Sequence, residues 1–408
     1  MKIQKKILFD MTVYQTGTTF HGGGEYSYTI LKGLMEQKDA HTQVDVFVGG
    51  RGRTDDKMLD QCRQAGMRVL FCKNASDLSG IVRKGGYHTL YSALPTAKYF
   101  EGLVLPDDVL LIITLHGLRK LELREGGMYS YFSNRDRYKS DVKEIVQKMI
   151  HRGNHMDQLK KEYDYLFKIT KHYLVVTDSY HSLYNTLRYF PQIGKKRIRM
   201  YYAPGKLAEK IDHVRYEEKV LRAYGVTTKK FGLILSANRM EKNPLRSIMA
   251  WDCVYTDCPE MMPPDFKTVV LGTDKPGRFL KHIRNKERFI FKGYVDDKEL
   301  EILYKHTHLL VFASLNEGFG YPPMEAMKYG TLVAASVNTS IPESCGSAAL
   351  MFNPLIVSEI ANRILQSFDP DIQQEKSAAI PAQFQKILDR QDADLNKIVA
   401  MILTESWA

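Results

Sequence analysis

Two glutamates separated by seven residues are the side chains best placed to bind a polyhydroxylated ligand. Glu317 lies in the segment 314–321, SLNEGFGY, and Glu325 follows the pair Pro322-Pro323. One carboxylate can accept hydrogen bonds from two hydroxyl groups, so each glutamate suits the diol of a hexose or a ribose. Alone, Glu325 would be a first-turn acid favoured by the helix dipole and Glu317 a solvated loop acid. Together, in a glycine-rich setting, they favour a binding site.

A strand, a glycine-rich loop and a helix must position this pair. The apolar run 309–313 predicts a buried strand. Pro322 suits a first helical turn because of its fixed φ, and Gly330 is a typical residue to end the helix after Tyr329. We expect this element to place backbone N–H groups at the carboxyl edge of a parallel sheet, where open α/β folds bind ligands and helix ends attract phosphate.

Two cations follow another predicted strand, 231–236. Residues 237–244 read ANRMEKNP, and a helical pattern follows them. Arg239 offers a planar fork of donors and Lys242 a point charge, which together suit a diphosphate. An isolated loop of this composition would be read as solvated surface, and the other motifs favour the binding site.

The first half of the chain carries two weaker signals. Gly22, Gly23 and Gly24 come before a predicted helix, and glycines let the backbone approach a ligand closely, although a flexible turn explains them as well. His116 follows the predicted strand 109–114. A lone histidine there is more often structural than catalytic.

Apolar runs alternate with amphipathic stretches along the whole chain, which favours parallel sheets with helices on both faces. The predicted strands of the first half are 7–10, 44–48, 68–71, 89–91, 109–114 and 173–177, with helices at 24–36 and 57–65. Those of the second half are 231–236, 268–272, 289–291, 309–313, 332–335 and 348–352.

Three segments stand apart from this alternation. The halves meet near 200–226, where a strand-like 198–202 leads to Ala203-Pro204-Gly205 and a charged helix. Residues 380–403 predict one long helix. The stretch 117–171 is too long for an ordinary crossover, and we expect a functional loop over 126–134 and a basic helix over 140–170.

Composition limits the classes of protein that fit. The 408 residues suffice for two domains, and no apolar run is long enough to cross a bilayer. The segment MKIQKKILFD is too short to be a signal peptide, so we expect a cytoplasmic protein. Its five cysteines have no zinc-ligand spacing. The net charge of +11 is dispersed and no nucleic-acid motif accompanies it, which favours a phosphorylated substrate or an anionic membrane surface.

The region from 312 to 350 resembles the retaining glycosyltransferases of family 4. The matching residues are Glu317, Gly318, Phe319, Gly320, Pro322, Glu325, Ala326, Met327, Gly330, Val333, Pro342, Glu343, Gly346, Ala348, Ala349 and Leu350. Further resemblance lies at Arg239 and Lys242, at 175–179 with Ser179 as a helix cap, and around Tyr294. The first half matches only at scattered points, and it has His116-Gly117 where the family often has His-Asp.

The resemblance implies an α/β fold of two Rossmann-like, doubly wound parallel-sheet domains facing each other across a cleft, the GT-B architecture. Residues 1–203 would bind the acceptor, 204–385 the nucleotide-sugar donor, and a helix from about 386 to 408 would pack back on the first domain. The implied activity moves a hexose from a UDP- or GDP-sugar to a glycan or lipid-linked acceptor, with retained configuration, in surface polysaccharide synthesis. The enzyme could lie at the inner face of the membrane.

The same resemblance assigns roles to the site residues. Arg239 and Lys242 would stabilise the diphosphate, Glu317 would orient the hexose and His116 would reach the sugar. Glu325 would hold the ribose, with Tyr294 near the base. The glycines at positions 22–24 would admit phosphate and acceptor, while Gly318, Phe319 and Gly320 would line the donor site. No acidic pair has metal spacing, so we expect no metal or other cofactor, and we expect Lys242→Ala to cut turnover without unfolding.

Three other functions remain open on the sequence. The chain could be a non-catalytic relative that binds a nucleotide sugar, against which the intact Arg239, Lys242, Glu317 and Glu325 argue. It could be another enzyme of the same architecture, such as an epimerase or a phosphorylase. Charge alone would suggest a nucleic-acid-binding protein, which we do not expect.

Overall fold

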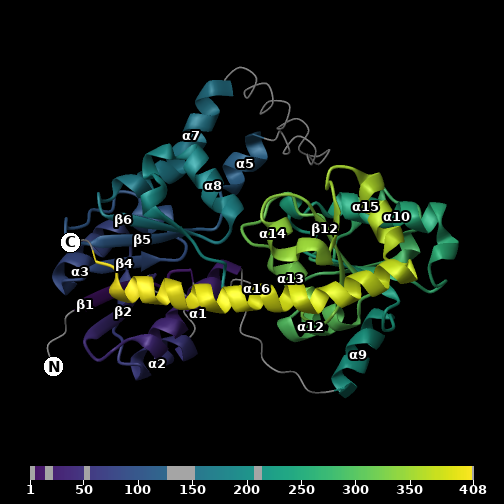
Figure 1. Cartoon of the computed structure of the whole chain (residues 1–408), viewed down its shortest axis with the longest axis horizontal. Coiled ribbons are helices and arrows are strands. Elements are labelled where there is room, and N and C mark those ends of the chain that lie inside the picture. Colours follow the sequence, from purple (N-terminus) through teal and green to yellow (C-terminus); the bar gives the residue numbers. More distant parts are fainter. Residues whose placement is uncertain (1–4, 14–21, 50–55, 126–151, 206–213, 407–408) are drawn as a thin grey trace. The chain divides into compact units, whose positions relative to one another are not determined.

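The computed structural model describes residues 5–13, 22–49, 56–125, 152–205 and 214–406. The described residues belong to two compact units (Figure 1). The first unit draws on Met1–Leu121, Ile145–Leu207 and Asp389–Ala408, and the second on Glu122–Glu144 and Ala208–Leu388. The predicted loop 126–134 and much of the predicted helix 140–170 lie outside the described residues.

The first unit contains a parallel sheet, here called sheet A, whose described strands follow the order β3-β2-β1-β4-β5-β6-β7. Its strands are β1 (Lys5–Asp10), β2 (Thr42–Gly49), β3 (Val69–Cys72), β4 (Thr89–Ser92), β5 (Leu110–Leu115), β6 (Tyr173–Thr177) and β7 (Ile198–Met200). The helices between them are α1 (Gly22–Gln37), α2 (Asp56–Gln64), α3 (Ala75–Gly85), α4 (Ala97–Phe100), α5 (Arg119–Glu125), α7 (Arg152–Asp164) and α8 (Tyr180–Tyr189).

The second unit contains sheet B, whose described strands are parallel in the order β10-β9-β8-β11-β12-β13. They are β8 (Phe231–Ile234), β9 (Lys267–Leu271), β10 (Phe289–Lys292), β11 (Leu309–Phe312), β12 (Leu332–Ser336) and β13 (Leu350–Phe352). The helices are α9 (Val214–Tyr224), α10 (Pro244–Asp257), α11 (Gly277–Leu280), α12 (Asp297–His306), α13 (Tyr321–Met327), α14 (Ile341–Cys345) and α15 (Val357–Gln366).

Both sheets follow the doubly wound strand order, in which the chain turns back at the sheet centre. The reversal lies between β1 and β4 in sheet A and between β8 and β11 in sheet B. Crevices outside the carboxyl ends of such central strands are the usual ligand sites of open α/β sheets. The α/β prediction with two doubly wound parallel sheets is therefore confirmed.

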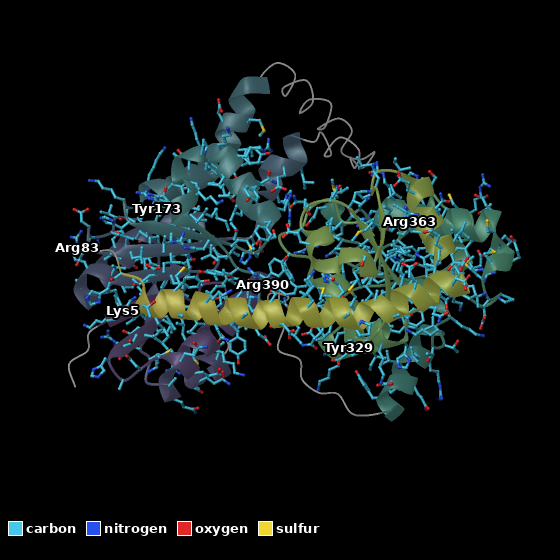
Figure 2. All side chains as sticks on the ribbon, viewed as in Figure 1. Lys5, Arg83, Tyr173, Tyr329, Arg363 and Arg390 are labelled. Atoms are coloured by element: carbon cyan, nitrogen blue, oxygen red, sulfur yellow. The ribbon has the colours of Figure 1, made fainter. Side chains whose placement is uncertain are left out.

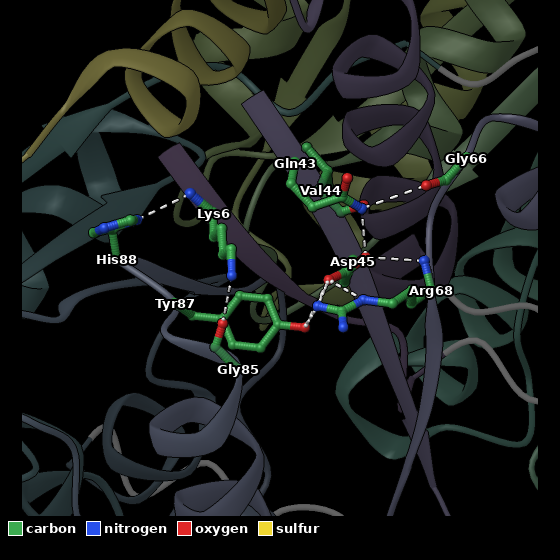
Figure 3. Close-up of polar contacts among 9 residues, drawn as sticks. All are labelled: Lys6, Gln43, Val44, Asp45, Gly66, Arg68, Gly85, Tyr87 and His88. Carbon is green, nitrogen blue, oxygen red and sulfur yellow. Dashed lines mark hydrogen bonds and ion pairs between the residues drawn. The ribbon is translucent and has the colours of Figure 1, made fainter. Parts of the chain in front are cut away.

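A network of hydrogen bonds connects neighbouring strands of sheet A at the side where their amino ends lie (Figure 3). The buried Asp45 carboxylate on β2 accepts hydrogen bonds from Arg68 Nη2 at 2.7 Å and from Tyr87 Oη at 2.7 Å. Lys6 on β1 donates to the carbonyl of Gly85 at 3.1 Å. Burial alone would raise the pKa of Asp45, but the bonds from Arg68 and Tyr87 hold it below its usual range. Since this edge lies opposite the carboxyl ends, we assign the network to stability.

The long C-terminal helix α16 (Pro370–Thr404) begins earlier than predicted. The prediction began the helix at residue 380, but the helix starts at Pro370 and continues through Pro381. Nearly half of the helix, Asp389–Thr404, belongs to the first unit, where the buried Asp394 accepts from Arg390 Nε at 2.5 Å and from the backbone N–H of Tyr202 at 3.0 Å. Figure 2 shows Arg390 on this helix. Gly33 allows this packing, because a Cβ there would lie 2.7 Å from Val399.

None of the described helices combines the length and the apolar character needed to cross a membrane.

Candidate functional site

The loops after β8 and β11 meet at the reversal point of sheet B. The backbone N–H of Leu315 donates to the carbonyl of Glu241 at 2.8 Å, and Ser314 Oγ donates to the same carbonyl at 3.2 Å. These bonds join the predicted diphosphate loop to the predicted sugar-binding loop. The two motifs, more than seventy residues apart in sequence, therefore share one edge of the sheet.

Lys242 and Glu317 form an ion pair within this junction. Their side chains are 8% and 9% exposed, and Lys242 Nζ also lies 5.3 Å from the centre of the Phe312 ring. A buried charge is costly unless an opposite charge accompanies it, so the pair fixes both side chains in one geometry. The structure thus brings together two of the predicted site residues.

The backbone around the cations has an unusual shape. Ser236 and Asn243 adopt positive φ angles of 54° and 55°, and Asn243 Nδ2 anchors its turn to the carbonyl of Pro354 at 2.6 Å. Gly272, at φ 103°, passes so close that a Cβ would lie 2.7 Å from the nitrogen of Ala237. Strained backbone of this kind clusters at functional sites. Between these residues, Arg239 precedes a single 3-10 turn and is exposed to solvent.

Glu317 is held from its other side by a turn that the sequence prediction did not assign to the site. Its backbone N–H donates to Thr339 Oγ1 at 3.1 Å, and Ser340 Oγ donates to its carbonyl at 3.1 Å. Thr339 has a positive φ of 57°. The signal was present, because this turn directly precedes Pro342-Glu343, which belongs to the matched motif.

Glu325 lies in the second turn of α13, not in its first turn as predicted. The helix begins at Tyr321, since Gly320 adopts φ 95° and serves as its N-cap. One carboxylate oxygen of Glu325 accepts a hydrogen bond from Tyr304 Oη at 2.8 Å. Burial and the Glu325 charge both raise the pKa of Tyr304 well above its usual value, so this hydroxyl stays a donor.

The N-terminus of α13 supplies fewer donors than expected. Pro322 and Pro323 occupy its first turn and carry no N–H, which leaves Gly320 and Tyr321 as the residues with backbone donors there. Positive charge at this edge must therefore come mainly from side chains. At the other end, the helix stops at Met327 with Lys328 as its C-cap, earlier than predicted, and Gly330, with φ 69°, lies in the turn that follows.

The other residues predicted to line the donor site differ in how far they are buried. Phe319 is buried, with its ring centre 5.5 Å from that of Tyr321, and Gly318 is half-buried beside it. Tyr294 follows β10 and is 70% exposed. Its predicted place near the base stays a prediction.

In the first unit, the structure gives His116 two partners. Nδ1 lies 3.0 Å from Asp178 Oδ2, and Nε2 lies 2.9 Å from the carbonyl oxygen of Ala93. The ring also meets Tyr26 edge-on, with centres 4.6 Å apart. Asp178 was not among the predicted site residues, because 62 residues separate it from His116. The neighbouring prediction for Ser179 is confirmed, since its hydroxyl caps α8 by accepting from the N–H of Ser182 at 3.1 Å.

The three glycines at positions 22–24 form the first turn of α1, whereas a glycine-rich loop before the helix was expected. A Cβ on Gly24 would lie 3.8 Å from the carbonyl of Val13, and one on Gly23 would lie 3.5 Å from Leu94, both ordinary contact distances. Packing therefore does not require glycine at these two positions. His21 lies outside the described residues.

Within the described residues, no group of three or more histidine, cysteine or acidic side chains is arranged to hold a metal ion.

Comparison with known protein families finds a match over the part of the chain that contains Lys242 and Glu317. Residues 219–377 match the family described as Glycosyl transferases group 1. The serotype-specific mannosyltransferase WbdA of Escherichia coli is 34% identical over 134 residues, which cover 31% of this chain and 16% of that protein. The O-antigen chain mannosyltransferase B of Escherichia coli is 42% identical over 89 residues, which cover 22% and 23%. The match thus spans less than a quarter of either relative.

A solved structure extends the likeness to the whole fold. HepE of Anabaena, in complex with UDP-glucose, has a TM-score of 0.64 and 17% identity, over 98% of this chain and 99% of that one. At this identity the likeness concerns the fold alone. The family match covers residues 219–377, and the two parallel sheets and this neighbour agree that the chain has the GT-B architecture of two parallel-sheet α/β units.

Proposed function

We propose that the chain is a glycosyltransferase that moves a hexose from a nucleotide-diphosphate sugar to a glycan or lipid-linked acceptor. The observation that carries the proposal is the junction at the reversal point of sheet B, where Lys242 is paired with Glu317 beside the exposed Arg239. Positive groups and a carboxylate at one sheet edge suit a ligand that joins a diphosphate to a sugar.

The chemistry follows from the charges that glycosyl transfer creates. When the anomeric carbon leaves the diphosphate, negative charge grows on the departing oxygen, and preorganised cations stabilise it. Arg239 can reach a ligand because it is exposed, whereas Lys242 is already fixed by Glu317. We assign the departing diphosphate to these two side chains and orientation of the hexose to Glu317.

Glu325 would bind the ribose hydroxyls of the nucleotide. Its carboxylate is oriented by the Tyr304 hydroxyl at 2.8 Å, and a carboxylate so held can still accept from other donors. This arrangement supports Glu325 as an acceptor in the donor site. We therefore expect Glu325→Gln to raise the KM for the donor while Tyr304→Phe has a smaller effect of the same sign.

The reaction would proceed with retained anomeric configuration and without a metal ion. Retention rests on the resemblance to family 4, and it is tested by proton NMR of the first product formed. Metal independence rests on the two side-chain cations assigned to the diphosphate. Turnover unchanged by EDTA is expected, and a strict requirement for a divalent ion would contradict this part of the proposal.

Mannose is the first donor sugar to test. Both named Escherichia coli relatives are mannosyltransferases, and one of them is an O-antigen chain mannosyltransferase. We propose a role in surface polysaccharide synthesis on the same ground. The net charge of +11 further supports an acceptor presented at an anionic membrane surface.

Release of nucleoside diphosphate by the purified chain tests the proposal. GDP-mannose and UDP-glucose are supplied with mannose-terminated oligosaccharides, and transfer is followed by mass spectrometry. A Lys242→Gln chain is the inactive control. Binding of both donors with neither transfer nor hydrolysis would instead favour a nucleotide-sugar-binding protein, and conversion of the sugar without transfer would favour an epimerase.

A further inference from the structure

The loop after β9 is bound to the loop that carries the two cations assigned to the diphosphate. Ala237, which follows β8, donates its backbone N–H to the carbonyl of Leu271 at 2.8 Å, and its own carbonyl accepts from Arg278 Nη2. Arg278 belongs to the short helix α11 of the β9 loop. Its side chain therefore lies against the turn that leads to Arg239, at the carboxyl edge of sheet B.

The Arg278 guanidinium is half-buried and has no acidic partner among the described residues. Its Cζ lies 4.6 Å from the centre of the Phe279 ring, and the bond to Ala237 uses only one of its five N–H groups. By contrast, Arg68 and Arg390 each pair with a buried aspartate. Because Arg278 is held in place without being neutralised, it keeps charge and donors for an anionic ligand.

The other groups at this edge supply little positive charge. Glu317 neutralises Lys242 within their buried ion pair, and Glu241 adds a further negative charge to the same loop. The two prolines in the first turn of α13 lack the N–H groups that a helix end would offer to phosphate. A diphosphate carries more than one negative charge at neutral pH, so the exposed Arg239 alone does not match it.

We propose that Arg278 is a third cationic residue of the donor site and binds the diphosphate of the nucleotide sugar beside Arg239. The inference rests on the proposed function and names a binding residue that the family resemblance did not indicate. The planar fork of a guanidinium suits two phosphate oxygens at once. Since Ala237 and Phe279 already hold this side chain, binding costs little further loss of its conformational freedom.

Arg278→Gln separates the charge of this side chain from its contact with the loop, because glutamine can still donate to the carbonyl of Ala237. Calorimetric titration uses GDP or UDP, whichever the wild type binds more tightly. We expect the Kd to rise about 10- to 100-fold at low salt, because a charge-assisted hydrogen bond is lost. The difference from the wild type should narrow at high salt, which screens the lost attraction.

Two results of this titration would overturn the proposal. The first is a wild-type Kd in Arg278→Gln. The second is an equal loss of affinity at low and high salt, which would mean that the side chain only shapes the loop. Arg278→Lys keeps the charge, so we expect it to retain the salt dependence of the wild type and part of its affinity.

Arg288→Gln is the matched control. Arg288 is also half-buried, donates from Nη1 to the carbonyls of Pro264 and Phe266, and has its Cζ 5.6 Å from the centre of the Tyr255 ring. It precedes β10, however, and so lies at the amino edge of sheet B. We expect this variant to keep the wild-type Kd. A loss as large as that of Arg278→Gln would point to the general charge of the unit and contradict a specific site.

Inorganic pyrophosphate tests which part of the nucleotide Arg278 contacts. It should displace the nucleotide from the wild type, and its competition constant should rise in Arg278→Gln by about the same factor as the Kd. An unchanged competition constant would place the guanidinium against the nucleoside and overturn the proposal, as would absence of competition in the wild type. A wild type that binds neither GDP nor UDP would remove the proposed function as well, whereas tight binding untouched by Arg278→Gln would remove this inference alone.

Discussion

Lys242 Nζ contacts Glu317 Oε1 inside the second unit, across 75 residues of sequence. The pair joins the loop after β8 to the loop after β11 at the reversal point of sheet B. Each side chain depends on the other, because either charge alone would be buried without compensation. Binding and stability are therefore coupled at this position.

This coupling changes the expected effect of Lys242→Ala. The sequence alone suggested lost turnover without unfolding, but removal of one partner of a buried pair costs about 3–5 kcal/mol. Lys242→Gln retains a donor for Glu317 and should lose less stability, while turnover should still fall on the order of 10²-fold because the charge is gone. Urea denaturation and donor turnover of the two variants measure these effects. An Ala variant as stable as the wild type would show that the pair is not buried in solution.

Arg239→Ala should separate function from stability. Arg239 is exposed, and surface substitutions usually change the free energy of unfolding by less than about 0.5 kcal/mol. Loss of its fork of donors should nevertheless weaken binding of a nucleoside diphosphate. The rise in Tm produced by saturating GDP or UDP should shrink, since stabilisation follows the ratio of ligand concentration to Kd. An unchanged rise for every nucleotide that stabilises the wild type would remove Arg239 from the site.

The sequence located the strands well, because parallel strands buried on both faces are continuous apolar runs. LLVF at 309–312 and YLVVT at 173–177 are examples, and each lies within a residue of its prediction. The resemblance also selected Lys242 and Glu317. Their ion pair was not predicted, because it depends on β8 and β11 being neighbours in the sheet.

The errors arose where local signals compete with packing. Gly22 and Gly23 were expected in a loop before a helix that begins at position 24, yet α1 already begins at Gly22. The long helix was predicted to begin at residue 380, although α16 starts at Pro370 and runs through Pro381. Asp178 carried no local signal, because only the register of β5 and β6 places it beside His116.

Gly272→Ala should distort the loop that carries Arg239 and Lys242. The added Cβ would lie 2.7 Å from the nitrogen of Ala237, and the φ of 103° is unfavourable for any other residue. Strain of this kind costs about 1–3 kcal/mol, and the clash adds to it. We expect a lower Tm together with weaker nucleotide binding.

Gly277→Ala is the control for that substitution, because a Cβ at Gly277 meets nothing within 4 Å. It should leave both the Tm and nucleotide binding unchanged. A Gly272→Ala protein that binds nucleotide with the wild-type Kd would show that the close approach of Gly272 to Ala237 does not shape the nucleotide-binding site.

The buried Asp10 and Asp45 carboxyl groups should make the stability of the fold depend on pH in opposite directions. Burial is the main cause that raises the pKa of Asp10 from 3.8 to about 6, against hydrogen bonds from Ser92 and Thr12. An acid whose folded pKa is raised stabilises the fold fully below its unfolded pKa, and that contribution is lost as pH rises from about 4 to about 6. Asp45, with its lowered pKa, stabilises the fold above its unfolded pKa and loses this effect as pH falls below about 4.

Asp10→Asn should therefore stabilise the protein at pH 7, where the wild-type carboxylate must be ionised while buried. The expected gain is on the order of 1–3 kcal/mol, from the shift in pKa, and it should shrink toward zero near pH 4. Asp45→Asn should instead destabilise at pH 7, because Arg68 would lose its anionic partner. Urea denaturation of the three proteins at both pH values measures these differences. A loss of stability in Asp10→Asn at pH 7 would show that Ser92 and Thr12 require the charged carboxylate.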